Sequence, residues 1–414
     1  MHRISSQMSN NDTQFNLRLQ ESRQNKINNQ IGSQQRLQSL REDPLAAGHL
    51  VRHQSFLGRM ERFEKNALTL SDQYAVRDGY MQQTVEVMQR VRELAVGGAN
   101  GIYNKDDLKN MASEVDELLK ELVQNANAVN QDGISLFAGT HTNGHAFDVV
   151  MGTAAGASEP VIHNVRYNGN IGTARVEIDE NAYITVENSG SKLFWAEPQA
   201  LFAQRDATAW QATEDSIIVV DGQEISVTAG DNVYSLIAKI NDSGAAVKAH
   251  LDPVTSGLNL NTTDARQLWL EDKSGNVLET LGLVKDKSQR PPYNLGDSVR
   301  VSGGSLFDTV IALRDAMLTG DTESIGGKIL GAIDSGLNNV VSGLAASGSA
   351  YERLQLNARR DSATALNVTQ MIAREGDVDF TKAITDMKLL DYVNQATLSN
   401  AGRMYSSTLL NYMR

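Results

Sequence analysis

The sequence predicts an α+β fold: an elongated rod of long, coiled-coil-like helices built from both chain ends, with a central, mainly-β domain inserted between them. In the first and last thirds of the chain, apolar residues recur at every seventh position, which is the spacing of a coiled coil. In the middle, apolar and polar residues alternate, which is typical of β-strands. Because the helical patterns enclose the β pattern, the simplest fold pairs N-terminal helices with C-terminal ones.

The composition excludes several classes of protein. The 414 residues carry a net charge of −12, whereas proteins that bind nucleic acids or anionic membranes favour a basic surface. The chain contains no cysteine, so it forms no disulfide, no thiolate metal site and no cysteine-based active site. The opening MHRISSQMSNNDTQF lacks the apolar stretch of a Sec signal peptide, and no apolar run is long enough to predict membrane insertion.

Both chain ends are polar segments with one thin apolar stripe. The N-terminal stripe, spaced as one helical face, consists of Ile4, Met8, Phe15 and Leu19. The C-terminal stripe consists of Leu398, Ala401, Tyr405, Leu409 and Tyr412. Helices this polar bury little apolar surface by themselves, so we expect both ends to be disordered in the monomer and to order when a neighbour covers them. The two stripes are the candidate assembly interface.

An Asp-Pro pair marks the start of the main helical body, within LREDPLAAGHL at residues 40–50. The carboxylate of Asp43 can cap the first turn of a helix, and Pro44 fits the first helical position because its missing N–H is not needed there. We therefore predict a boundary turn at Asp43, Pro44 and Leu45.

The first long helix is predicted from residues seven apart between 46 and 96, a length of about 75 Å at 1.5 Å per residue. Its first row is Met60, Ala67, Tyr74, Met81, Met88 and Ala95. A second row contains Phe63, Leu70 and Val91, and is broken by Arg77 and Thr84. The glycines of VGGANG, residues 96–101, are expected to end the helix.

The second long helix precedes Gly376. Its predicted seam is Leu337, Leu344, Tyr351, Ala358, Ala365 and Ile372. The flanking row is Ile333, Val340, Leu354 and Val368, with Ser347 and Asp361 as polar exceptions. Six glycines between residues 326 and 348 each cost this helix about 1 kcal/mol relative to alanine, so it needs packing partners.

Shorter elements are predicted from capping and alternation. Asn104 with Asp107, and Ser305 with Asp308, have the spacing of capping boxes, and the helix after Asn104 is expected to end near Gly133. ARVEI (174–178), YITVE (183–187) and EISVT (224–228) alternate as strands, and Asp221-Gly222 is a hairpin signal. One short helix is expected over residues 233–240.

These patterns predict three nested domains. The terminal helices comprise residues 1–42 and 373–414. The long-helix bundle comprises residues 43–140 and 301–372, and a mainly-β outer domain comprises residues 141–300.

No constellation of residues predicts catalysis, a cofactor or a metal site. His49 and His53 share a helical face, but no carboxylate lies between them and Arg52 does, so we interpret them as solvated side chains. His141 and His145 lie in a predicted turn without a carboxylate cluster. The glycine-rich VGGANG and VSGGS lack the strand or lysine of a phosphate-binding loop. We predict that the protein is not an enzyme.

Several segments resemble the bacterial flagellin family and, within it, the hook-associated proteins of the hook–filament junction. MHRISSQM is similar to the family's start, and EDPLAA, residues 42–47, resembles its Asp-Pro-x-Ala-Ala stretch. GISLFAGTHTNGHAFD (133–148), the 165–194 segment with its Tyr-x-Gly, and GGSLFDTVIALRDAM (303–317) resemble the hook-associated branch more than ordinary flagellins. The C-terminal DFTKAITDMKLLDYVNQATLSN resembles the terminal helix of the family.

The resemblance implies a structural protein between hook and filament, exported through the flagellar type III apparatus, whose terminal helices line an inner tube. Implied partners are flagellin, the neighbouring hook-associated junction protein, copies of itself in a ring and an export chaperone. The implied location is a flagellum that is external or periplasmic. Two alternatives stay open: a filament flagellin, or a flagellin-like rod whose β insertion binds a ligand or carries an activity.

Overall fold

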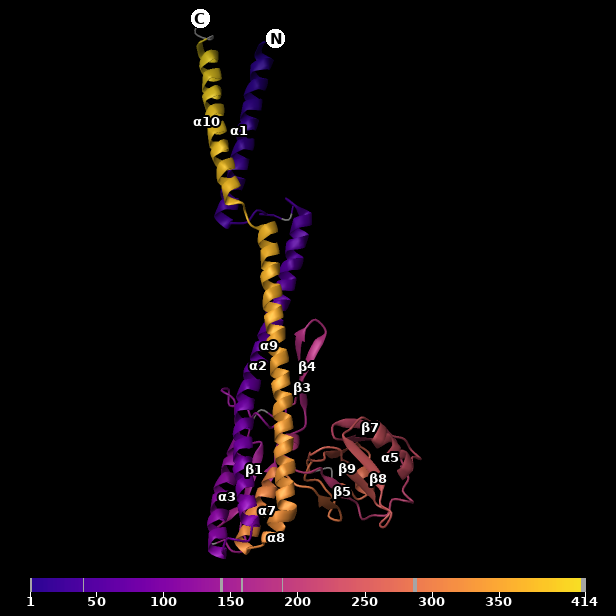
Figure 1. The fold of residues 1–414 in the computed structure, drawn as a ribbon. Helices are drawn as coiled ribbons and strands as arrows, with labels where there is room; N and C mark the ends of the chain where they lie inside the picture. The colour runs from indigo at the N-terminus through magenta and orange to yellow at the C-terminus, as the bar shows by residue number, and fades with distance from the viewer. Residues whose placement is uncertain are drawn as a thin grey trace. The chain divides into compact units, whose positions relative to one another are not determined.

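The structure, a computed structural model, describes residues 2–39, 41–141, 144–157, 159–187, 189–285 and 289–410. Long helices come first and last in the chain and strands lie between them, so the predicted α+β class is confirmed (Figure 1). The chain separates into two compact units. The terminal unit comprises Met1–Lys65 and Asn357–Arg414, and the central unit comprises Asn66–Leu356. These limits fall inside the two longest helices, and the predicted three-domain division stays a prediction.

The first long helix, α2, spans Pro44–Ala99 and buries the row that its sequence predicts. Every member of the predicted first row is buried, as are Phe63, Leu70 and Val91 of the second. Thr84, a polar interruption, is also buried, because its hydroxyl donates to the Tyr80 carbonyl one turn earlier at 2.9 Å. A single long helix with one continuous apolar face therefore forms as expected.

The second long helix, α9, spans Leu330–Gly376 but buries a different row from the predicted one. Of the predicted seam only Ala358 is fully buried. The fully buried row is the flanking one, which includes both polar exceptions: Ile333, Val340, Ser347, Leu354, Asp361 and Val368. Close packing at Gly336 and Gly343 helps to explain which face of α9 is buried. A Cβ on either would come within 2.5 Å of the Leu306 or Leu193 side chain, so the helix is packed closely there.

Other helices of the central unit include α3, Lys105–Ala126, and α7, Leu306–Thr319, which is followed by α8, Thr322–Ser324, and a π-helical turn, Ile325–Ile329. Both predicted capping boxes are present, at Asn104 with Asp107 and at Ser305 with Asp308. The helix α3 ends at Ala126, not near Gly133 as predicted. Asn127 ends it, because its side chain both donates to and accepts from the backbone of Phe147 at 2.8 Å.

Two antiparallel hairpins follow, β1 (Phe147–Gly152) with β2 (Val161–Tyr167), and β3 (Thr173–Asp179) with β4 (Ala182–Glu187). The second contains the predicted strands ARVEI and YITVE. The buried Arg314 of α7 joins the first hairpin to the helices, since it donates to the Ile162 carbonyl at 2.7 Å and pairs with Asp116 of α3 at 3.0 Å. The hairpin β1–β2 thus belongs to the helical core.

Five aromatic rings form the centre of that helical core. The ring centroids of Phe147 lie 5.1 Å from Tyr167, 5.3 Å from Phe194 and 5.0 Å from Phe307. Phe137 packs edge-on against Phe194 at 5.1 Å. The Tyr167 hydroxyl donates to the Asn170 carbonyl at 2.8 Å, and burial raises the pKa of this phenol to about 12. These five rings thus pack together where several segments of the helical core meet.

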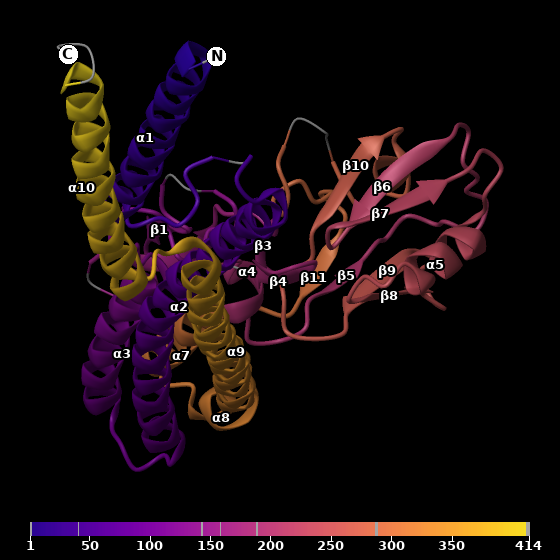
Figure 2. The same ribbon diagram turned by 90° about the horizontal axis from the view of Figure 1, so that it is seen from above.

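A second core is built from residues 201–299 and defines the β domain of the central unit. A four-stranded sheet has the order β11 (Arg300–Ser302), β5 (Ala200–Phe202), β9 (Leu258–Thr262), β8 (Val247–Leu251). A three-stranded sheet has the order β10 (Leu270–Ser274), β6 (Ser216–Val220), β7 (Gln223–Val227), and Figure 2 shows both sheets. The predicted helix is α5, Val233–Asp242, which packs on β8; α4, Gly190–Leu193, and α6, Val277–Thr280, are single turns.

The predicted Asp221-Gly222 hairpin turn is confirmed. It joins β6 to β7, and both residues have positive φ angles, 49° and 80°. This is the backbone of a type I′ turn, which Asp and Gly adopt at little cost.

We predict that Phe147→Ala lowers the free energy of unfolding of the central unit by about 3–5 kcal/mol, because it empties the middle of the aromatic cluster. All three tryptophans, at 195, 210 and 269, belong to this unit, so denaturant unfolding followed by tryptophan fluorescence reports on it alone. The matched control is Phe15→Ala, whose ring in the terminal unit is 68% exposed. Equal losses in the two variants would contradict the cluster's role.

Candidate assembly site

The two terminal helices pair with each other through a seam of mixed polar and apolar side chains. They are α1, His2–Ser33, and α10, Phe380–Leu410, which lie side by side in Figure 1. Gln20 Nε2 donates to Thr397 Oγ1 at 3.2 Å, and Gln24 Nε2 donates to the Asp391 carboxylate. The half-buried positions of α1 include Thr13, Leu17, Gln20, Gln24, Ile27 and Ile31. The half-buried or buried positions of α10 include Ala383, Met387, Leu390, Asn394, Thr397 and Ala401.

The predicted apolar stripes lie mostly outside this seam. Phe15 is 68% exposed and Leu398 is 55% exposed, and Leu19 is exposed as well. Leu17, which the predicted stripe omits, is half-buried instead. Ala401 alone among the described stripe side chains is buried. Within one chain, then, Phe15, Leu19 and Leu398 are not covered by the opposite helix.

For the other stripe residues the structure describes the backbone only or nothing at all. Ile4, Met8, Tyr405 and Leu409 belong to α1 and α10, but their side chains are outside the described residues. Tyr412 lies outside them altogether. Their part in assembly stays a prediction.

Sequence reasoning missed a further set of exposed apolar side chains along α10. They are Phe380, Ile384, Leu389, Tyr392 and Val393. Their spacing is irregular and the helix is apolar on several sides, so a search for one stripe did not separate the face that packs on α1 from the faces that stay open. Together with the exposed stripe residues they leave large apolar side chains open to solvent along the terminal helices.

The boundary turn has the local geometry that the sequence predicts. The Ala46 N–H donates to the Asp43 carboxylate at 3.1 Å, and α2 begins at Pro44. Leu45 is 72% exposed, so it is available for a contact with another molecule. Such a contact between subunits stays a prediction.

Arg36 connects the boundary turn to the end of α9, and sequence reasoning did not single it out. Its N–H donates to the Gly376 carbonyl at 2.7 Å and its Nε to the Glu375 carbonyl at 3.0 Å. Its guanidinium also lies 3.6 Å from the Asp43 carboxylate. Beside it, the Val378 N–H donates to the Gln34 carbonyl at 3.1 Å. The chain segments that lead into α2 and out of α9 are thus bonded together where the terminal helices begin.

The two histidines that the sequence places near the boundary turn lie close to each other in α2. His49 Nδ1 lies 3.3 Å from a Glu375 carboxylate oxygen, and the His53 ring is 6.4 Å from the His49 ring. Throughout the described part of the chain, no three His, Cys, Asp or Glu side chains come together as a metal site would need. In the same residues, no helix combines the length and the apolar character that crossing a bilayer requires.

Charge is divided unevenly between the two units. The terminal unit holds 17 Lys and Arg residues against 12 Asp and Glu, whereas the central unit holds 21 against 38. The acidic character of the whole chain therefore comes from the central unit, and the paired helices belong to a mildly basic one.

Two ranges of the chain match models of known protein families. Residues 4–142, which include α1, the boundary turn and α2, match the model of the bacterial flagellin N-terminal helical region. Residues 216–264 of the β domain match the model of the flagellin hook IN motif. The two matched ranges cover less than half of the chain, and they show a similarity to bacterial flagellin-type proteins. The matches thus cover the N-terminal helical part of the chain and part of its β domain, and α10 lies outside both matched ranges.

The individual relatives include flagellins and hook-associated proteins. It is 35% identical to flagellin FlaB1 of Treponema pallidum over 78 residues, which are 19% of this chain and 27% of that protein. It is 20% identical to flagellar hook-associated protein 3 of Escherichia coli over 297 residues, 70% of this chain and 86% of that protein. Across the first four curated relatives, the matched part spans 22% to 53% of their length.

Among solved structures, the chain is similar to a flagellar hook-associated protein 3 from Legionella pneumophila. The two share 16% sequence identity over 78% of this chain and 97% of the other, with a TM-score of 0.47.

We predict that Asp43→Ala weakens the first turn of α2 by about 1 kcal/mol, because it removes the cap of the Ala46 N–H. Amide exchange at Ala46 and Ala47 should accelerate about fivefold. Asp43→Asn is the matched control: it keeps a capping oxygen and loses only the partly exposed pair with Arg36, which contributes little. If both variants accelerate exchange equally, the ion pair and not the cap holds the turn.

Proposed function

We propose that this chain is a structural, non-enzymatic component of the bacterial flagellum that joins hook to filament and assembles through its terminal helices. The observation that carries the proposal is the arrangement of α1 and α10, which hydrogen-bond to each other through polar side chains and leave Phe15, Leu19 and Leu398 exposed. A helix pair of this kind is incomplete alone, because much of its apolar surface is on the outside.

Assembly with neighbouring copies would bury the apolar side chains that α1 and α10 leave exposed. Burying a Leu or Phe side chain contributes about 1.5–3 kcal/mol, so a few such residues against neighbouring copies stabilise both helices and the contact between subunits. A polar segment that orders only on binding also suits export in an unfolded state through the flagellar type III apparatus. The flagellum would then be external, or periplasmic in bacteria that carry it there.

The junction role is favoured over a filament role by the extent of alignment. The match to hook-associated protein 3 of Escherichia coli extends over 86% of that protein, whereas the match to flagellin FlaB1 covers 27% of that one. Partners under this proposal are flagellin on one side, the neighbouring hook-associated protein on the other, copies of the chain in a ring and an export chaperone before assembly.

A filament flagellin is the second candidate, and one observation favours it: the matched segment of FlaB1 is the more identical, at 35% against 20%. A ligand-binding or enzymatic role for the β domain has less support. Its interior is filled by apolar side chains, including Leu236, Ile240, Leu258 and Leu260.

Labelling the protein on isolated flagella of the source bacterium separates the two roles. With an epitope placed at Val254, which is 89% exposed in the β domain, the junction role predicts one band where hook meets filament. Label along the whole filament, or long filaments formed by the purified protein, would establish the filament role instead. Label on neither structure would overturn both.

We predict that Leu398→Asp prevents assembly while leaving the central unit folded. Incorporation into flagella should fall more than about tenfold, because a side chain that contributes about 1.5–3 kcal/mol is replaced by a carboxylate that would be buried. The control is Val254→Asp, an equally polar change at an exposed apolar residue of the other unit. Normal flagella in cells that carry only the Leu398 variant would show that the terminal helices do not make the subunit contacts.

A further inference from the structure

The β domain is attached to the helical core by two stretches of chain that are bonded to each other. The chain leaves the core at Phe194 and returns at Leu306, whose N–H donates to the Phe194 carbonyl at 2.9 Å. One step further, the Ala196 N–H donates to the Gly304 carbonyl at 3.0 Å, and β5 then pairs with β11. A ribbon of two paired stretches of chain is stiff along its length. If it were the only attachment, the β domain could rotate about it.

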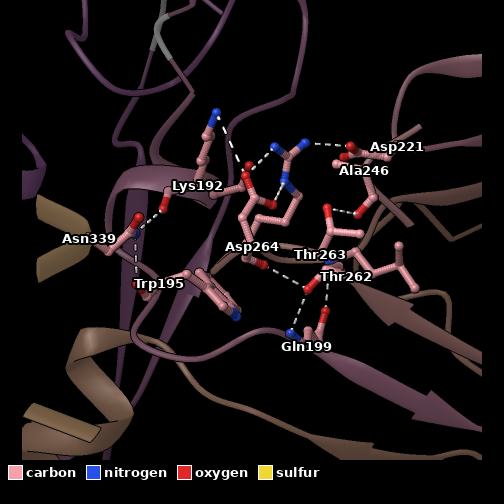
Figure 3. Close-up of polar contacts among 12 residues, drawn as sticks. Lys192, Trp195, Gln199, Asp221, Ala246, Thr262, Thr263, Asp264 and Asn339 are labelled. Carbon is pink, nitrogen blue, oxygen red and sulfur yellow. Dashed lines mark hydrogen bonds and ion pairs between the residues drawn. The ribbon is translucent and has the colours of Figure 1, made fainter. Parts of the chain in front are cut away.

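Asn339 of α9 binds the base of this ribbon. Its side-chain Nδ2 donates to the Lys192 carbonyl at 2.7 Å and to the Trp195 carbonyl at 2.9 Å, as Figure 3 shows. Gly336 and Gly343, one turn to either side of it on α9, leave room for the ribbon, since added Cβ atoms would collide with Leu306 and Leu193. The helix therefore approaches the ribbon closely enough for a short amide side chain to reach two carbonyls.

A second attachment lies on the segment between β9 and β10. The Gln267 N–H donates to the Ser191 carbonyl at 2.9 Å, and Trp269 packs against the helical core. Gln199, which lies on the ribbon, binds this segment through its side chain: Oε1 accepts from the Leu268 N–H at 2.7 Å. The backbone N–H of Gln199 donates to Thr262 Oγ1 at 2.8 Å. The segment thus touches both the ribbon and the core.

Arg266 fixes the shape of that segment through charge. Its guanidinium donates to both oxygens of Asp264 and to the Asp221 carboxylate, and the side chains of Arg266 and Asp221 are only 17% and 8% exposed. Burial raises the pKa of Asp221 above its ordinary value, and the charge of Arg266 opposes that rise. Lys192, from α4 at the base of the ribbon, lies 3.9 Å from Asp264 (Figure 3).

Besides joining β6 to β7, the hairpin turn contacts the segment between β9 and β10. Its positive φ angles direct Asp221 toward Arg266, and the Asp221 N–H donates to the Trp269 carbonyl at 2.8 Å. A Cβ on the next residue, Gly222, would lie 3.4 Å from the Ile171 side chain, so the turn also borders the segment before β3.

We propose that Asn339 and the Arg266–Asp221 pair form a latch that holds the β domain in one orientation on the helical core. With the ribbon as its one attachment, the β domain could rotate about the ribbon. Asn339 binds the ribbon where it leaves the helical core. The 264–269 segment, shaped by Arg266, adds contacts to the core that are separate from the paired strands. Loss of Asn339 and Arg266 together therefore frees rotation of a domain whose own apolar core is unchanged. Both are positioning residues, and the inference does not depend on the flagellar role.

Distance measurement between two spin labels on the full-length chain tests the latch. The chain has no cysteine, so Val341→Cys on α9 and Val254→Cys in the β domain, both exposed, can be labelled uniquely. The labelled protein should give one narrow distance distribution. With Asn339→Ala and Arg266→Gln together, the distribution should become at least twice as wide, while the far-ultraviolet circular dichroism spectrum stays that of the folded protein.

The matched control is Lys273→Gln, which removes a cation from the exposed pair with Glu224 in the same domain. Its distribution should stay as narrow as that of the parent. An unchanged width in the double variant, or equal broadening by Lys273→Gln, overturns the latch. If Arg266→Gln unfolds the domain, Asn339→Ala alone decides, because Asn339 lies outside the β-domain core and its loss should still broaden the distribution; an unchanged width then overturns the proposal.

Discussion

Packing of five aromatic rings determines where the elements of the central unit lie. Phe194 and Phe307 stack with their centroids 5.7 Å apart, and they stand where the chain leaves for the β domain and where it returns. Phe147 and Tyr167 bring both strands of the β1–β2 hairpin to the same point. Because these residues come from separate stretches of chain, one cluster orders α7, the hairpin and the base of the ribbon together. The ribbon whose base Asn339 binds thus begins and ends beside this cluster.

The parts of the fold that the sequence predicted depend on contacts within a few residues. The capping boxes at Asn104 and Ser305, the Asp43 cap and the Asp221-Gly222 turn each join atoms no more than four residues apart. The buried row of α2 was equally predictable, since one helix face is fixed by spacing alone. Local chemistry of this kind can be recognised without knowing what the segment packs against.

The parts that were not predicted depend on a partner far away in the chain. The helix α3 ends where it does because Asn127 meets Phe147. The helix α9 has two candidate rows, and contacts with other segments decide its orientation near Gly336 and Gly343. At the terminal helices the spacing identified apolar stripes, but spacing does not reveal whether a stripe faces inward. Within one chain the hydrogen bonds between these helices come instead from Gln20 and its neighbours one turn along.

Polar contacts have opposite consequences at the terminal helices and at the latch, and the difference is one of burial. In the half-buried α1–α10 seam, water competes for Gln20 and Gln24, so each hydrogen bond contributes about 0.5–1.5 kcal/mol and can be exchanged. Such a seam sets the register of two helices without making their rearrangement costly. Arg266 and Asp221 are largely buried, so separating them leaves a charge unpaired away from water, which costs far more. Exchangeable polar contacts thus lie where the chain has apolar surface left for neighbours, and the contact that resists exchange is the Arg266–Asp221 pair of the β domain.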